Sequence, residues 1–128
     1  MRMCAYSPIQ DWREMQELIK AMKALSDETR LRMLNVLMAR ECCVCEIIQA
    51  LNVSQTRASR NLGILEEAGF LKSRREGLWM LYSIDWSGAN RYASSLSRLI
   101  KELPVRHDVL TEDRKRLKKA QRVGLKCD

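Results

Sequence analysis

The amino-acid sequence predicts a mainly α-helical fold with one two-stranded β-ribbon. Apolar residues recur at three- and four-residue steps through most of the chain, which is the period of amphipathic helices. Two short runs with strand character flank a Glu-Gly pair within residues 70–84. A length of 128 residues with five Gly and two Pro fits one folded domain with a single core. We expect one domain over residues 1–104, with its functional core at about 25–85, and a basic tail, flexible or partly helical, over 105–128.

Two helices are predicted in the first 40 residues. Residues 9–25 place apolar side chains along one helical face, and Ser26 or Asp27 then offers a side-chain oxygen to cap a second helix that continues through Arg40. The dense apolar pattern of the second helix indicates that it is largely buried. The apolar residues of the first helix are Ile9, Trp12, Met15, Leu18, Ile19, Met22 and Leu25.

A third helix and a fourth follow, with a tight turn between them. Apolar residues within 44–51 mark a short third helix, which ends at Asn52 and Val53. Ser54 is well suited to cap the fourth helix, which we expect over residues 55–68. A short helix, a turn and a second, capped helix form the helix-turn-helix arrangement.

The ribbon comes next and is followed by one more helix. The runs FLKSRR and LWMLYSI are predicted strands, with Glu76 and Gly77 at the hairpin tip. A helical pattern returns over about residues 87–103, until Pro104 interrupts it. The end of the chain, TEDRKRLKKAQRVGLKCD, has too few apolar residues to be expected in a core.

The helix-turn-helix and the ribbon together predict a DNA-binding protein. The start of the fourth helix would enter the major groove, and the ribbon would act as a wing against the adjacent backbone or minor groove. A formal charge of +7 and a pI near 9.4 favour a polyanionic partner. The candidate DNA-binding residues are Ser54, Gln55, Thr56, Arg57, Ser59 and Arg60 on the helix, with Lys72, Arg74 and Arg75 on the ribbon.

Other classes of protein fit the sequence less well. No window is long and apolar enough for a membrane span and no signal peptide is evident, so we expect a cytoplasmic protein. With a single His and no phosphate-cradling Gly-rich loop, little is present to build an enzyme site, and nothing indicates a protein substrate. That residue, His107, is expected to be a solvated surface side chain.

The stretch ECCVC concentrates three of the five cysteines before the helix-turn-helix. An odd number of cysteines excludes a fully paired intrachain disulfide framework, and thiols in the cytoplasm are mostly reduced. Thiolates select thiophilic ions such as As(III), Sb(III), Cd(II), Pb(II), Cu(I) or Zn(II). Two alternatives remain open, namely buried cysteines that act as small apolar residues and a redox- or persulfide-responsive switch.

Four segments resemble one known family in order and spacing. LSDETRLRML, CVCEI, SQTRASRNLGILEEAGFL and GLWMLYSI are similar to the core of the ArsR/SmtB winged-helix metalloregulators over about residues 25–85. The resemblance implies a homodimeric repressor that binds double-stranded operator DNA when free and releases it when a metal or metalloid binds. It implies a dimer through the first helix and the helix after the wing, and apolar stripes on those helices agree with burial in a symmetric partner.

The resemblance also implies a ligand site. Cys43 and Cys45 match the CVC motif of the family's arsenic- and cadmium-type sensors, and As(III) or Sb(III) is the expected inducer. In the arsenic-type pattern a further cysteine follows three positions after the motif, where this chain has Ile48. A third thiolate would then come from Cys42, Cys4 or Cys127.

The spacing of the clustered cysteines suggests a mechanism. On a regular helix Cys42 and Cys45 share one face, whereas Cys43 and Cys45 point roughly 200° apart. An ion held by Cys43 and Cys45 would therefore distort the start of the third helix. We hypothesise that this distortion moves the attached recognition helix out of register with DNA.

Overall fold

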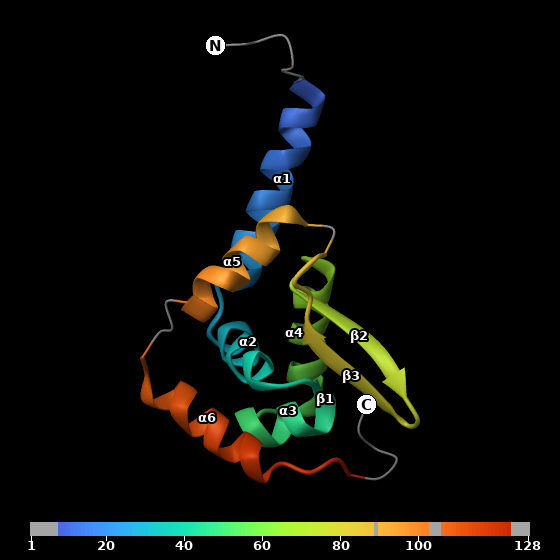
Figure 1. The fold of residues 1–128 in the computed structure, drawn as a ribbon, viewed down its shortest axis with the longest axis vertical. Helices are drawn as coiled ribbons and strands as arrows, with labels where there is room; N and C mark the ends of the chain where they lie inside the picture. Colours follow the sequence, from blue (N-terminus) through green and yellow to red (C-terminus); the bar gives the residue numbers. More distant parts are fainter. Residues whose placement is uncertain (1–7, 89, 103–105, 124–128) are drawn as a thin grey trace.

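The computed structural model describes residues 8–88, 90–102 and 106–123 and confirms the predicted fold class. The helices α2, α3 and α4 enclose the core, and α1 lies with α5 at one end of the molecule (Figure 1). The helices are α1 (Pro8–Leu25), α2 (Glu28–Ala39), α3 (Val44–Leu51), α4 (Gln55–Glu67), α5 (Arg91–Glu102) and α6 (Asp108–Lys119). The strands are β1 (Cys42–Cys43), β2 (Leu71–Glu76) and β3 (Trp79–Ile84). No helix among the described residues is long and apolar enough to span a membrane.

The apolar faces predicted from the sequence meet in one main core. In α2, α3 and α4 the buried residues recur at helical spacing, so each helix turns one face inward. Burial of large apolar side chains contributes about 1.5–3 kcal/mol each, which makes the core between α2, α3 and α4 the main source of stability. The largest fully buried side chains here are Phe70, Met33, Leu34, Ile47, Leu51, Leu62 and Leu65.

Side-chain caps fix the helix-turn-helix as predicted. The Asp27 carboxylate accepts from the Arg30 N–H at 3.1 Å at the start of α2, and the Ser54 hydroxyl accepts from the Arg57 N–H at 3.1 Å at the start of α4. Between α3 and α4 the chain turns at Asn52, whose φ of 58° lies in the left-handed region that Asn tolerates better than most residues. These caps set where the recognition helix begins.

The predicted ribbon is part of a three-stranded antiparallel sheet of order β1-β3-β2. The wing forms as expected, but its tip lies one residue later than predicted: Glu76 ends β2 opposite Trp79, and the turn consists of Gly77, at positive φ, and Leu78. The two-residue strand β1 was not predicted, because two residues are too short to show a strand pattern. Its residues Cys42 and Cys43 pair with β3, so the helical spacing assumed for them does not apply, although α3 itself covers the predicted residues 44–51.

The end of the chain differs most from the prediction. Residues 108–119 form a helix that packs against α2 and α3, and its Leu117 belongs to the main core. The expectation that this segment stays apart from the core is therefore wrong. Its few apolar residues suffice because a buried ion pair, that of Asp113 with Arg32, holds the helix in place. Leu103 and Pro104, predicted to end the preceding helix, lie outside the described residues.

Candidate nucleic-acid interface and thiol cluster

The start of α4 presents an exposed polar face. Ala58, Leu62 and Leu65 turn into the core, which directs the intervening residues to solvent. The candidate DNA-binding residues that the structure leaves exposed on this helix and at its cap are Ser54, Gln55, Thr56, Arg57, Ser59 and Arg60. The predicted recognition surface is therefore accessible as a unit.

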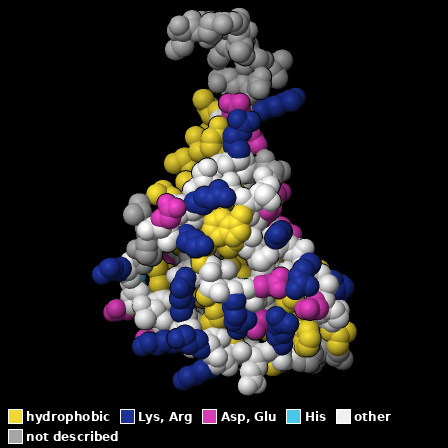
Figure 2. All heavy atoms as spheres, viewed as in Figure 1, with side chains coloured by type: hydrophobic (Ala, Val, Ile, Leu, Met, Phe, Trp, Pro, Cys, Tyr) yellow, Lys and Arg dark blue, Asp and Glu magenta, His cyan; other side chains and the backbone are white. Residues whose placement is uncertain are grey.

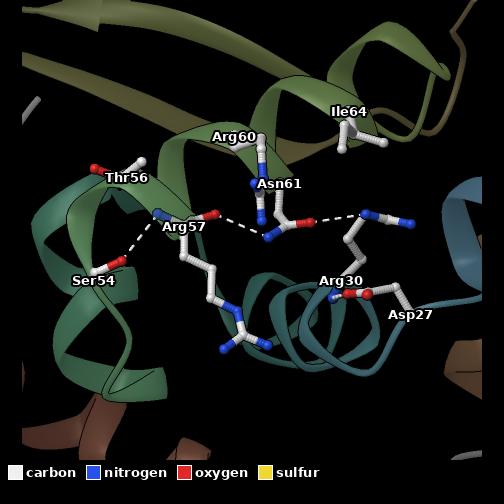
Figure 3. Close-up of a pocket in the computed structure, with 8 residues that line it drawn as sticks. All are labelled: Asp27, Arg30, Ser54, Thr56, Arg57, Arg60, Asn61 and Ile64. Atoms are coloured by element: carbon white, nitrogen blue, oxygen red, sulfur yellow. Dashed lines mark hydrogen bonds between the residues drawn. The ribbon is translucent and has the colours of Figure 1, made fainter.

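A polar cavity of about 510 Å³ lies between α4 and the start of α2 (Figure 3). The Arg30 guanidinium donates to the Asn61 side-chain oxygen at 2.8 Å, and the Asn61 amide donates to the Arg57 carbonyl at 2.9 Å. Three arginines line the cavity against one carboxylate, so its charge suits a phosphate oxygen. The lining residues are Asp27, Arg30, Ser54, Thr56, Arg57, Arg60, Asn61 and Ile64.

Three residues of this region were not predicted from the sequence. Thr29 accepts from the Arg57 guanidinium at 2.7 Å and thereby orients it, while Arg30 and Asn61 form the floor of the cavity. One signal was present, since Asn61 is a polar residue within the apolar face of a helix and is only 4% exposed. A buried amide needs hydrogen-bond partners, and Arg30 and the helix backbone supply them.

The wing carries its basic residues on two different faces. Successive side chains of a strand alternate, so Lys72 and Arg74 share one face and Arg75 points to the other. All three are exposed, but Arg74 makes a bidentate ion pair with Glu41 at 2.8 and 3.0 Å. The proximity of Glu41 raises the pKa of Arg74 above its ordinary value. Lys72 and Arg75 are therefore more available to a polyanion than Arg74.

Cys43 and Cys45 lie together in a small cluster of their own, which we call the thiol cluster. Its other members are Leu81, which is buried, and Trp79, which packs against it. Cys43 stands opposite Leu81 in the sheet, whereas Cys42 stands opposite Tyr82 and belongs to the main core. Neighbouring residues of a strand point to opposite faces, so β1 separates Cys42 from the thiol cluster.

The geometry expected from a helical wheel does not apply to these cysteines. Cys43 is the N-cap of α3, in an extended conformation with φ −86° and ψ 169°, and Cys45 lies in the first turn. The expected 200° divergence of Cys43 and Cys45 is therefore wrong, as is a common helical face for Cys42 and Cys45. Cys43 and Cys45 pack in the same cluster while α3 keeps its regular form from Val44 onward.

Cys42 has the chemistry of a core residue. Its thiol donates to the Arg40 carbonyl at 3.3 Å, and burial raises the pKa of Cys42 to about 12. It lies in the main core, whereas Cys43 and Cys45 belong to the thiol cluster. In the described part of the chain, no group of three His, Cys, Asp or Glu side chains is placed to hold a metal ion. Cys4 and Cys127, the other candidates for a third ligand, lie outside the described residues.

Polar groups surround the thiol cluster. The Glu46 carboxylate accepts from the Cys43 N–H at 2.9 Å and from Arg40 at 2.8 Å. Burial opposes its ionisation, but these bonds hold the pKa of Glu46 below its ordinary value. The indole N–H of Trp79 is buried, and no acceptor for it was found among the described residues. The Trp79 side chain itself packs against the thiol cluster.

The single histidine has a local structural role. The ring nitrogen Nδ1 of His107 accepts from the Val109 N–H at 3.1 Å and so caps α6, while the residue itself is exposed. This agrees with the expected surface position of the side chain. It also explains part of how α6 begins where it does.

The chain is similar to known bacterial and archaeal transcriptional regulators. Residues 27–73 match the family model described as bacterial regulatory protein, arsR family. The chain is 50% identical over 64 residues to the arsenic resistance transcriptional regulator ArsR1 of Pseudomonas putida, an alignment that covers 48% of this chain and 49% of that protein. It is 44% identical over 63 residues to a helix-turn-helix-type transcriptional regulator of Methanocaldococcus jannaschii, covering 48% of this chain and 71% of that protein.

A solved structure extends the likeness to the fold. The homodimeric winged helix-turn-helix DNA-binding domain of a possible ArsR-family regulator from Mycobacterium bovis has a TM-score of 0.64 and 29% identity. The alignment covers 79% of this chain and 89% of that domain. By contrast, the chain spans about half the length of the first curated relatives that it matches.

Proposed function

Because the chain belongs to the ArsR family of bacterial regulatory proteins, we propose that it is a homodimeric repressor that binds operator DNA and releases it when a thiophilic ion binds. As(III) or Sb(III) is the preferred inducer, and Cd(II), Pb(II), Zn(II) and Cu(I) are the alternatives. One observation carries this proposal. The helix α3 has the thiol cluster at its start and the turn to the recognition helix at its end, so one rigid element links both sites.

DNA binding is supported by the charge and accessibility of α4. The exposed residues at its start contain no acidic side chain, and the arginine-lined cavity beside them suits a phosphate. The wing adds exposed Lys72 and Arg75. We expect the protein to recognise inverted half-sites about one turn of DNA apart, because the dimer has two-fold symmetry.

Arg60→Ala is expected to weaken DNA binding by about 5- to 150-fold, which corresponds to the ~1–3 kcal/mol of a lost base or phosphate contact. Fluorescence anisotropy would measure it, with DNA that the protein itself selects from a random-sequence pool. Arg106→Ala, which removes an exposed arginine outside α4 and the wing, is the matched control. Equal losses in the two variants would contradict a specific role for Arg60.

The dimer is supported by an apolar stripe that the single chain leaves exposed. Large side chains project from one face of α1, which packs against α5, and Figure 2 shows apolar groups exposed along α1. Such a stripe on two packed helices fits a second copy of the chain. The exposed residues are Trp12, Met15, Ile19 and Met22 on α1 and Leu99 on α5.

Ile19→Glu is expected to raise the dimer dissociation constant by about 100-fold or more, since each dimer would bury two carboxylates without partners. Sedimentation equilibrium would measure the constant. Arg13→Glu places a carboxylate at an exposed position about 120° around α1 from Ile19 and should leave the dimer intact. A dimer unaffected by Ile19→Glu would show that another surface is used.

The inducer is supported by the chemistry of the thiol cluster. Cys43 and Cys45 supply two soft ligands in one cluster, against which the Trp79 side chain packs. A trigonal As(III) needs a third thiolate; Cys4 and Cys127 are candidates, whereas Cys42 would first have to leave the main core. Adding arsenite, antimonite, cadmium, lead, zinc and copper(I) in turn to the protein–DNA complex tests the function. An unchanged DNA affinity with every ion would exclude it.

A further inference from the structure

The helix α6 and residues 120–123 contact α3 at both of its ends, and we call this segment the clasp. Figure 1 shows α6 running alongside α3 at the end of the molecule away from α1. This helix is long enough to bridge the start and the end of the eight-residue α3. The contacts at its two ends are different in kind.

At the end of α3 the clasp holds the turn that leads into the recognition helix. The Asp113 carboxylate is fully buried and accepts from Arg32 at 2.8 and 2.9 Å and from Arg116 at 2.7 Å. The same two guanidiniums donate to the last carbonyls of α3, Arg32 to Leu51 at 2.7 Å and Arg116 to Ala50 at 2.8 Å. These carbonyls have no partner within a helix. Arg116 of the clasp supplies one for Ala50, and Arg32 of α2, which is paired with Asp113 of the clasp, supplies one for Leu51.

From Gln49, in the second half of α3, the clasp continues to Glu46 at the start of that helix, beside the thiol cluster. Gln49 exchanges two hydrogen bonds with the Gln121 backbone, at 2.7 and 3.1 Å. Arg122 donates to the Glu46 carboxylate at 3.3 Å and lies 5.7 Å from the centre of the Trp79 ring. The Glu46 oxygen that accepts from Arg122 is also the one that accepts from the Cys43 N–H. A shift of the Cys43 backbone therefore moves the Glu46 oxygen to which Arg122 of the clasp is bonded.

We propose that the clasp is a coupling element that transmits occupancy of the thiol cluster to the helix-turn-helix. Drawing Cys43 and Cys45 around an ion disturbs the Cys43–Glu46–Arg122 contacts, and α6 carries the displacement to the Ala50 and Leu51 carbonyls. The recognition helix then changes its orientation. This inference rests on the proposed function, because it assigns the path of that regulation and the residues that carry it.

The electrostatics of Arg122 agree with this linkage. Burial acts against its charge, but the ion pair with Glu46, with a smaller contribution from Cys43, raises the pKa of Arg122 above its ordinary value. The guanidinium thus responds to charge on both groups. A change of charge at Cys43 on ion binding alters the attraction that holds the end of the clasp.

The test compares DNA affinity with and without arsenite in the full-length chain. The variants are Gln49→Ala and Arg122→Ala, singly and combined, and the control combines the exposed positions Arg106→Ala and Thr111→Ala. The ratio of the two dissociation constants measures the coupling, which is typically about 5- to 150-fold. Arsenite binding is measured separately from the arsenic–thiolate absorption band.

We expect the combined clasp variant to bind arsenite and DNA with affinities within about threefold of the control, while the coupling ratio falls at least threefold toward one. A ratio equal to that of the control would overturn the inference. Loss of arsenite binding would also overturn it, because the clasp would then belong to the ligand site. If circular dichroism shows the combined variant unfolded, Gln49→Ala alone decides. A wild-type ratio of one would instead exclude the proposed function itself.

Discussion

Cys43→Ser and Cys45→Ser are each expected to abolish the release of DNA by arsenite. The unmodified protein should lose about 5- to 150-fold in DNA affinity when arsenite binds, and either variant should lose less than about twofold. The reason is geometric, since these two thiols share one cluster and a serine hydroxyl is a poor ligand for a soft ion. The measurement is fluorescence anisotropy with a fixed DNA duplex, with and without arsenite.

Cys42→Ser tests the distinction, which the sequence alone does not make, between Cys42 in the main core and the two cysteines of the thiol cluster. Cys42 faces the main core and its thiol is protonated, so the variant should keep the arsenite response. It should lose about 1–3 kcal/mol of stability, because a hydroxyl replaces a buried thiol. If Cys42→Ser loses the response while its fold is intact, Cys42 is a ligand and β1 must rearrange on binding. Cys4→Ser and Cys127→Ser identify the third thiolate in the same assay.

A redox switch makes a different prediction for the same set of variants. Hydrogen peroxide would release the DNA without any added ion, and dithiothreitol would reverse the release. We expect peroxide at low concentration to have little effect on DNA binding when arsenite is fully active. A response to peroxide that requires both Cys43 and Cys45 would favour the redox alternative.

The helix-turn-helix was predictable because its signals are local. Ser54 caps α4 and Asp27 caps α2, as the position of each before an apolar helical pattern indicates. The wing was predictable for the same reason, with Gly77 at a tip that needs positive φ. In these segments the residues that determine the structure are neighbours in the sequence.

The thiol cluster and α6 were not predictable because their causes are distant in the sequence. Cys42 and Cys43 are extended only because the edge of β3 offers hydrogen bonds, and this reverses which cysteines share a face. The helix α6 is held by Arg32, which lies 81 positions before Asp113. In composition, residues 108–119 cannot be told from a solvated tail. Only the ion pair of the buried Asp113 with Arg32 distinguishes them.

Asp113→Ala is expected to cost about 3–5 kcal/mol of unfolding free energy, the largest loss of stability among the substitutions considered. Removing this carboxylate leaves the guanidiniums of Arg32 and Arg116 without their shared acceptor, and Arg32 is largely buried. Urea unfolding followed by circular dichroism would measure the change. Glu112→Ala, which removes a carboxylate that pairs with Lys115 on the exposed side of the same helix, should cost about 0.5 kcal/mol or less.

The difference in stability between Asp113→Ala and Glu112→Ala separates the effect of losing a buried ion pair from the effect of losing one negative charge. Each removes one carboxylate from the first half of α6, but only Asp113 connects α6 to α2 and to the last turn of α3. A loss below about 1 kcal/mol for Asp113→Ala would mean that water replaces the carboxylate at low cost. The turn into the recognition helix would then depend on packing alone. A loss near the expected value means that the position of that turn depends on a residue 61 positions beyond Asn52, in a segment whose composition is that of a tail.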